Sequence, residues 1–233
     1  MKNKYQTLEK KININFKDKR LLTNAFVHRS YLNEHKNFPI PSNERLEFLG
    51  DSVLSLITSV YLFKNYPAFK EGDYTDIKSA IVKKETLAQA AEKLNLGQYL
   101  FLSKGEEKEG GRKNKNILAD VFEALIGCIF LDQGFEITYR FVCDFLFIPQ
   151  LNEIVNKKLY LSSKTRLQEY IQAKYKKTPL YKLLEEKGPA HRRWFKVAVY
   201  FNQKQLGVGG GASKKEAEEM AAKNALQNLK LMI

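Results

Sequence analysis

The chain has 233 residues, of which 44% are hydrophobic and 28% charged, so it is too apolar for a disordered tail and too short for more than two ordinary domains. Lys and Arg total 39 against 26 for Asp and Glu, and the net charge of +13 favours a polyanionic partner over a small neutral substrate. The two cysteines lie in apolar surroundings, which argues against a disulfide framework or a cysteine-based metal site and favours a reducing compartment.

The N-terminal segment and the most apolar windows argue against export and against a membrane span. Residues 1–20 are charged throughout and lack the apolar centre of a signal peptide. The windows 117–131 and 141–151 contain acidic residues and are shorter than the ~20 residues that a span requires. We therefore expect a cytoplasmic protein without membrane contact.

Residues 44–60 have apolar side chains at helical spacing, with acidic residues on the opposite side. At about 100° per residue, Glu44, Glu47 and Asp51 fall within roughly 60° of one another, so three carboxylates share one stripe of this helix. A solvated face is the simplest interpretation of such a stripe. In that interpretation Glu44 gains from its place in the first turn, where the helix dipole favours a negative charge.

A second predicted helix, over residues 117–130, is apolar nearly all round and still contains Asp120 and Glu123 one turn apart. Burying an unpaired carboxylate costs several kcal/mol, so this pair needs Arg partners, a shared proton or a cation. Ala124 and Gly127 lie on the same face and leave room for another helix or a ligand. Four or five carboxylates from two helices suit Mg²⁺ or Mn²⁺ and predict metal-dependent phosphoryl chemistry on a polyanion.

The chain divides into two parts near residue 161. Pro149, the polar stretch 152–158 and two serines at 162–163 interrupt the apolar periodicity. Residues 162–233 hold 15 basic and 6 acidic side chains, so most of the excess positive charge lies in the last 72 residues. We predict a first domain over 1–150, a linker over 151–162 and a second domain over 163–233.

The second part predicts an α-β-β-β-α order. A helix over about 164–175 precedes strand-like runs at 179–186, 193–202 and 204–208, and a final helix covers 214–231. The odd-numbered positions from 195 to 201 are Phe or Val, which is the period of a sheet with one buried face.

The start of the final helix is marked by Ser213 and Glu216, which form a capping-box pattern. Lys214 and Lys215 project from this helix N-terminus, where free N–H groups and the dipole already favour a phosphate. Lysines that only solubilise the helix end are the alternative interpretation. The glycine-rich run 207–212 formally matches a dinucleotide fingerprint, but no βαβ unit follows, and we expect a tight, closely approaching loop before the helix.

Motifs across nearly the whole chain resemble those of the ribonuclease III family. Residues 43–52 (NERLEFLGDS) resemble the family signature, and residues 117–127 (ILADVFEALIG) resemble its second acidic helix. Shorter matches occur at 28–30, 71–73, 105–106, 165–170, 188–191 and 213–215. The resemblance implies an all-α endonuclease domain followed by a small α+β double-stranded RNA-binding domain, acting as a homodimer with two active sites in one cleft.

The same resemblance assigns roles to individual residues. It implies that Glu47, Asp120 and Glu123 hold Mg²⁺, with Mn²⁺ as a substitute, and that catalysis depends on Glu123 and on Asp51, which orients the attacking water. It places Phe48 at a dimer contact. It also implies a substrate-cleft role for three acids, Glu44, Glu71 and Glu106. In the second domain it implies RNA contacts from Thr165, Gln168, Glu169, Pro189, His191, Ser213, Lys214 and Lys215.

From this resemblance we predict a Mg²⁺-dependent endoribonuclease that hydrolyses both strands of duplex RNA, leaving 5′-phosphates and short 3′ overhangs, and that processes ribosomal RNA precursors and other structured transcripts. Contacts to 2′-hydroxyls over ~16 base pairs imply little sequence dependence and no DNA specificity. The alternatives are an RNA-binding protein that has lost turnover and a phosphohydrolase of small nucleotides. All the matched acids are present, which argues against the first, and the second leaves the basic tail unexplained.

Overall fold

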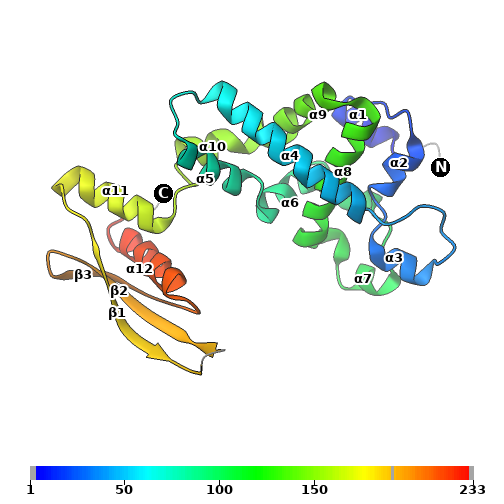
Figure 1. The fold of residues 1–233 in the computed structure, drawn as a ribbon. Coiled ribbons are helices and arrows are strands. Elements are labelled where there is room, and N and C mark those ends of the chain that lie inside the picture. Colours follow the sequence, from blue (N-terminus) through cyan, green and yellow to red (C-terminus); the bar gives the residue numbers. More distant parts are fainter. Residues whose placement is uncertain (1–3, 190–191, 231–233) are drawn as a thin grey trace. The chain divides into compact units, whose positions relative to one another are not determined.

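The computed structural model describes residues 4–189 and 192–230, and the chain forms two compact units, Met1–Asn156 and Lys157–Ile233 (Figure 1). Among the described residues of the first unit, all regular elements are helices, and Val27 and Phe101 form one isolated β-bridge. In chain order the elements are α1 (Gln6–Ile12), α2 (Lys19–Asn24), α3 (Arg29–Glu34), α4 (Glu44–Asn65), α5 (Glu71–Ile81), α6 (Lys84–Lys93), η1 (Leu96–Tyr99), α7 (Lys104–Lys108), η2 (Gly111–Lys113), α8 (Lys115–Gln133), α9 (Phe135–Val142), η3 (Cys143–Leu151) and α10 (Asn152–Asn156).

Helices α4 and α8 pack against each other with their backbones in contact (Figure 1). A Cβ added at Gly50 of α4 would lie 1.8 Å from the carbonyl oxygen of Glu123, and one at Gly127 of α8 would lie 2.3 Å from that of Leu46. The close approach predicted at Gly127 is therefore confirmed. Helix α8 is also buried nearly all round, as its sequence predicts, because 11 of its 19 residues are buried.

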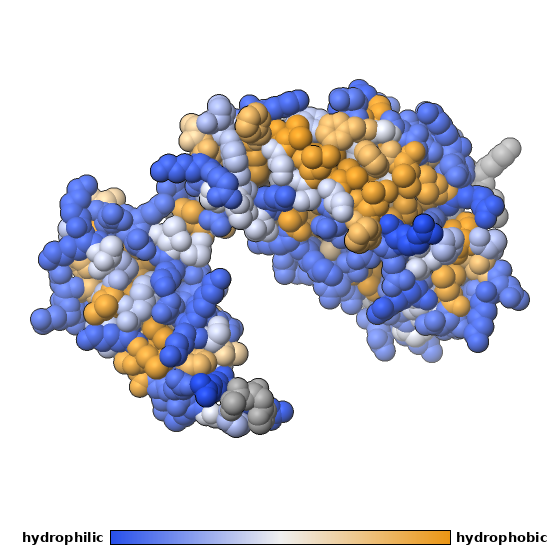
Figure 2. Space-filling view, viewed as in Figure 1, coloured by the Kyte–Doolittle hydropathy of each residue, from blue (hydrophilic) through white to orange (hydrophobic). Residues whose placement is uncertain are grey.

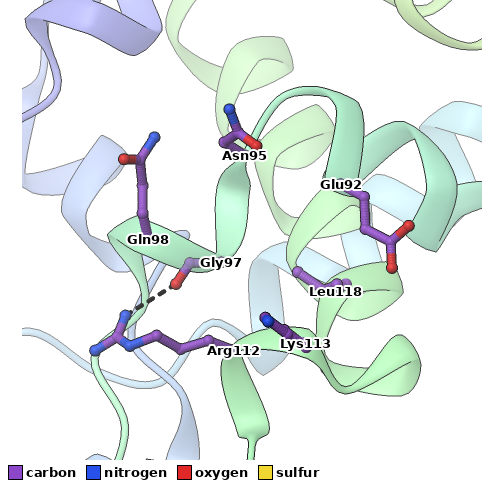
Figure 3. A pocket seen from close by; sticks show the side chains of 7 residues that line it. All are labelled: Glu92, Asn95, Gly97, Gln98, Arg112, Lys113 and Leu118. Atoms are coloured by element: carbon purple, nitrogen blue, oxygen red, sulfur yellow. Dashed lines mark hydrogen bonds between the residues drawn. The ribbon is translucent and has the colours of Figure 1, made fainter.

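Arg112, just before the start of α8, makes a network of hydrogen bonds, and Figure 3 shows its bond to Gly97. The Nη1 of Arg112 donates to the carbonyls of Gly97 (2.9 Å) and Leu100 (3.1 Å), and its Nη2 donates to Oε2 of Glu107 (2.7 Å). These bonds hold η2 against η1 beside an open cavity of about 490 Å³. The N-terminal end of the helix that contains Asp120 therefore has a defined position.

Helix α4 is long and apolar enough to cross a membrane by length and composition, with a mean hydropathy of 1.4 in its most apolar window. Its buried residues, among them Leu54 and Ile57, face the core of the first unit. On the other side Phe48, Leu56 and Phe63 are 78%, 54% and 75% exposed, and Figure 2 shows an apolar band along this helix. We call these three residues the α4 apolar face.

The second unit is an antiparallel sheet with two helices on one face (Figure 1). Its elements are α11 (Ser163–Tyr175), β1 (Leu180–Lys187), β2 (Trp194–Phe201), β3 (Lys204–Gly211) and α12 (Lys214–Asn228), and the strand order is β1-β2-β3. Leu167, Val197 and Ala221 belong to the core between sheet and helices. The predicted α-β-β-β-α order is confirmed, and α12 ends at Asn228 rather than 231.

The glycine run at 207–211 lies inside β3, so the loop predicted there is wrong. A Cβ at Gly207 would lie 2.5 Å from the carbonyl oxygen of Ala221, and one at Gly209 would lie 2.2 Å from the Ala221 nitrogen. Glycine is needed in this strand because α12 packs directly on its backbone. The close approach was correctly predicted, but it serves sheet packing and not a turn.

Candidate functional site

Helices α4 and α8 bring three carboxylates together. Ligand oxygens of Glu47, Asp120 and Glu123 all lie within 4.8 Å of one another, and all three residues are half-buried. The contact between Gly50 and the backbone of α8 makes this convergence geometrically feasible, because it sets the two helices side by side at these positions. The two acidic stripes seen in the sequence therefore form one cluster, which we call the carboxylate cluster.

Two carboxylates of this cluster, those of Glu47 and Glu123, retain protons more strongly than ordinary acids. Burial, followed by the negative charges of Asp51, Glu47 and Asp120, raises the pKa of Glu123 to about 8. Burial and the charge of Asp120 also raise the pKa of Glu47. These directions mean that ionising the whole cluster is unfavourable unless a positive charge is present.

A lysine that the sequence analysis did not single out supplies part of that charge. The Nζ of Lys84, at the first position of α6, donates to Oδ1 of Asp120 at 3.1 Å. This hydrogen bond raises the pKa of Lys84. The charge of Lys84 opposes the larger effects that raise the pKa values of Glu47 and Glu123. Nothing in the local sequence distinguishes Lys84 from other lysines, since its partner lies 36 residues away.

A cavity of about 200 Å³ opens beside the carboxylate cluster. Its lining combines carboxylates with a cation and an imidazole, and consists of His28, Arg29, Asn43, Glu44, Glu47, Ile117 and Asp120. The Oε2 of Glu44 accepts from Ser42 Oγ at 2.7 Å, and Arg29 Nη1 lies 3.9 Å from Glu44 Oε1. Burial lowers the pKa of His28, which favours the neutral form of its imidazole. This mixed lining suits a phosphodiester held beside a cation.

The other predicted acids of the first unit lie around this cavity or apart from it. Asp51 is exposed one turn after Glu47, and its charge acts on Glu123. Glu106, in α7, lies near enough to His28 for its charge to raise the pKa of His28, although burial lowers that pKa by more. Glu71 begins α5, is exposed and accepts from Thr75 Oγ1 at 3.2 Å. Neither Glu71 nor Glu106 belongs to the carboxylate cluster or to the cavity lining.

In the second unit the predicted RNA contacts that the structure describes are exposed on α11, at the start of α12 and after β1. Thr165, Gln168 and Glu169 are exposed on α11, and Pro189 is exposed after β1. His191 lies outside the described residues. Ser213 is the N-cap of α12, as predicted, and its hydroxyl accepts from the Glu216 N–H at 3.1 Å. The predicted capping box is shifted by one residue, because Glu216 accepts from the N–H of Ala212 at 2.8 Å.

The starts of α11 and α12 are tied to each other. Glu219 accepts from the N–H groups of Ser163 (2.5 Å) and Lys164 (3.2 Å), and Glu218 pairs with Lys164 Nζ at 2.5 Å. Lys214 and Lys215 stay exposed at the first two positions of α12. The start of α11 is therefore joined to the first turns of α12 by hydrogen bonds and an ion pair.

The comparisons with known proteins agree with this architecture. Residues 18–150 match the family model for ribonuclease-III-like domains, and residues 163–229 match the double-stranded RNA binding motif. Ribonuclease 3 from Bacillus cereus (strain G9842) is 46% identical over 226 residues, which cover 97% of this chain and 91% of that protein. The chain belongs to the ribonuclease III family. Ribonuclease 3 from Bacillus anthracis is likewise 46% identical over 226 residues, which cover 97% of this chain and 91% of that protein.

Solved structures of ribonuclease III support the first unit. The nuclease domain of ribonuclease III from Campylobacter jejuni is 38% identical, with a TM-score of 0.58, and covers 64% of this chain and 97% of that chain. A second structure of that domain gives a TM-score of 0.57. The family and the fold class predicted from the sequence, a helical nuclease domain followed by a double-stranded RNA-binding domain, are thereby confirmed.

Proposed function

We propose that this ribonuclease III family protein is a Mg²⁺-dependent endoribonuclease that hydrolyses both strands of duplex RNA. The single observation that carries the proposal is the carboxylate cluster of Glu47, Asp120 and Glu123, in a chain that also has a double-stranded RNA binding motif. A protein that only bound RNA would have no use for three converging, half-buried carboxylates, whose burial is unfavourable. A phosphohydrolase of small nucleotides would not need the RNA-binding motif.

The residues of the cluster fit a hard divalent cation. Three carboxylate oxygens within 4.8 Å of one another, on carboxylates whose pKa values are raised at Glu47 and Glu123, suit Mg²⁺ with Mn²⁺ as a substitute. When bound there, such an ion lowers the pKa of a coordinated water and stabilises charge on phosphate oxygens. The ligands would be Glu47, Asp120 and Glu123.

The chain's own residues would position the other reactants. Asp51, whose charge reaches Glu123, would accept a hydrogen bond from the attacking water and orient it toward the phosphorus. Glu44, Glu71 and Glu106 would contact the substrate at the edge of the cleft. Cleavage at the bond to the 3′-oxygen leaves a 5′-phosphate, and two such sites offset across a duplex would leave a short 3′ overhang.

The two sites would come from a homodimer formed through the α4 apolar face. Phe48, Leu56 and Phe63 expose large apolar surfaces on a helix that also positions the carboxylate cluster, and a second copy would cover them. The Campylobacter jejuni nuclease domain has a region involved in dimer formation. Phe63→Ser should therefore convert the protein to monomers in sedimentation without loss of helix content.

The second unit would hold the duplex. Exposed polar residues of α11 suit ribose 2′-hydroxyls in a minor groove, and Lys214 and Lys215 suit the phosphates across the neighbouring major groove. Such contacts read the A-form shape and 2′-hydroxyl groups, so DNA would be excluded. Substrates would include ribosomal RNA precursors and other structured transcripts in the cytoplasm, with no membrane involved.

Cleavage of a long end-labelled RNA duplex tests the proposal. We expect short duplex fragments with the unaltered protein and Mg²⁺, and intact RNA with chelator or with Glu123→Ala. Glu136→Ala, which removes an exposed acid of α9 outside the cluster, is the matched control and should cleave normally. If the RNA stays intact in the Mg²⁺ reaction but shifts in a native gel, the protein binds RNA without cleaving it and the proposal is wrong.

A further inference from the structure

The sheet of the second unit has an uncovered face. Helices α11 and α12 cover the side to which Phe195, Val197 and Val199 point, and the intervening residues of β2 point to the opposite side. We call this opposite side the outer sheet face, and Figure 2 shows apolar residues among polar ones over these strands. Its principal members are Leu180 and Lys182 of β1 and Trp194, Lys196 and Tyr200 of β2.

The indole of Trp194 lies against the backbone of the neighbouring strand β3 and remains half exposed. It is the single tryptophan of the chain and is 53% exposed. A Cβ added at Gly210 of β3 would lie 2.5 Å from Cζ2 of the indole and 2.9 Å from Cε2. Because Gly210 has no side chain, the indole can contact the backbone of β3 directly. This contact positions the ring although it is not buried.

A second aromatic ring is held at the other end of the same strand. Tyr200 pairs with Leu180 across the sheet, and its hydroxyl donates to Oε1 of Gln205 at 3.2 Å. The Nζ of Lys182 lies 5.4 Å from the centre of the Tyr200 ring. Tyr200 and Lys182 also line an open cavity of about 240 Å³, to which Lys177 contributes. A fixed ring with cations beside it thus borders a hollow.

The charge of this face is positive. Lys182 and Lys196 lie on it between the two rings, and Lys177 lies at its edge. The one acid of β1 opposite Lys196 is Glu185, and a hydrogen bond from Lys187 together with the charge of Lys196 lowers its pKa. Fixed aromatic rings that alternate with lysines on an open sheet are the arrangement by which proteins bind unpaired nucleic acid, since bases stack on the rings and phosphates meet the cations.

We propose that the outer sheet face binds an unpaired RNA strand, with bases stacked on Trp194 and Tyr200 and phosphates near Lys182 and Lys196. Apart from Pro189 and His191, which lie between β1 and β2, the residues expected to contact a duplex lie on or next to the helices that cover the other side of the sheet. A duplex and an unpaired strand can therefore be bound on opposite sides of the sheet. The natural occupant is the single-stranded segment that adjoins a duplex in a folded transcript. This binding does not depend on cleavage, so it can fail while the proposed nuclease activity holds, and the reverse is equally true.

Because Trp194 is the single tryptophan, its fluorescence reports on this face of the full-length protein. In chelator, which prevents cleavage, a uridine oligonucleotide of about ten nucleotides should quench this emission to saturation. Tyr200→Ala should weaken the binding about tenfold, as expected for the loss of one stacked base. Lys182→Ala should weaken oligonucleotide binding severalfold. Because this side chain is exposed, the substitution should leave the unfolding transition unchanged. Lys223→Ala, which removes an exposed lysine of α12, is the matched control and should bind normally.

A second measurement separates the outer sheet face from the duplex surface. A duplex with a single-stranded 3′ extension should bind the unaltered protein more tightly than the blunt duplex. Tyr200→Ala should reduce this difference and leave the blunt-duplex affinity unchanged. Lys214→Ala should weaken the binding of both duplexes equally.

Three results would overturn the proposal. One is equal oligonucleotide affinity in Tyr200→Ala, Lys182→Ala and the unaltered protein. Another is a loss of oligonucleotide binding that occurs only in Lys214→Ala, because the strand would then lie on the duplex surface. The third is tryptophan emission that does not change when RNA is added but does change with protein concentration. That result would assign the outer sheet face to a contact between protein copies.

Discussion

The raised pKa of Glu123 makes the stability of the metal-free protein depend on pH. Its pKa is about 8 in the folded chain, against an ordinary value of 4.5 that applies when the chain is unfolded. Between these two values the folded state binds more protons than the unfolded state. The free energy of unfolding therefore falls as the pH rises from 4.5 toward 8, and this loss of stability is complete above pH 8.

The size of this effect follows from the same values. A shift from 4.5 to about 8 would correspond to about 5 kcal/mol for a fully desolvated carboxyl group. Glu123 is only half-buried, so solvent screens the charge and we expect about 1 to 2 kcal/mol. In a domain of this size, such a change moves the Tm by about 2 to 8 °C.

Replacing the acid by its neutral isostere tests this reasoning. In chelator, Glu123→Gln should unfold at a higher temperature than the unaltered protein near pH ~9 and at a similar temperature near pH ~5. Mg²⁺ should raise the Tm of the unaltered protein through binding to the folded state and should act much less on the variant. The control Glu136→Gln should unfold like the unaltered protein at both pH values and should gain the full Mg²⁺-dependent rise in Tm. A Glu123→Gln protein that is less stable than the unaltered one near pH ~9 in chelator would refute the argument.

Four further variants probe the contacts around the two sites. Gly50→Ala places a Cβ 1.8 Å from the Glu123 carbonyl oxygen, so thermal unfolding should show a loss of about 1 to 3 kcal/mol and cleavage should fall although no ligand is removed. Lys84→Ala removes the cation beside the carboxylate cluster, so the Tm in chelator should fall more steeply with pH, by less than about 1 kcal/mol because this lysine is exposed, and Mg²⁺ should restore it. Lys214→Ala and Lys215→Ala should each weaken duplex RNA binding and lower the salt slope by about 1 in affinity titrations.

Much of the fold could be predicted because its signals are local. Apolar spacing predicts the two helices of the carboxylate cluster, and the alternation in β2 predicts a sheet with one buried face. The loop predicted at the glycine run of β3 is wrong because glycine locally favours a loop, whereas the packing of α12 that requires glycine there comes from a distant segment. Lys84 was missed for the same reason, since its hydrogen bond to Asp120 exists only in the folded chain.

The difference between a solvated acidic stripe and a metal site lies in the glycines among the acids. Gly50 follows Glu47 by three residues, and Gly127 follows Glu123 by four, so each glycine lies on the same helix face as the acid before it. A side chain at either position would hold the helices apart, because the added Cβ would collide with the opposite backbone. The carboxylates would then stay in two separate stripes, each open to water. An acidic stripe with a glycine three or four residues away on each of two apolar helices is therefore a stronger sign of a shared cation site than the acids alone.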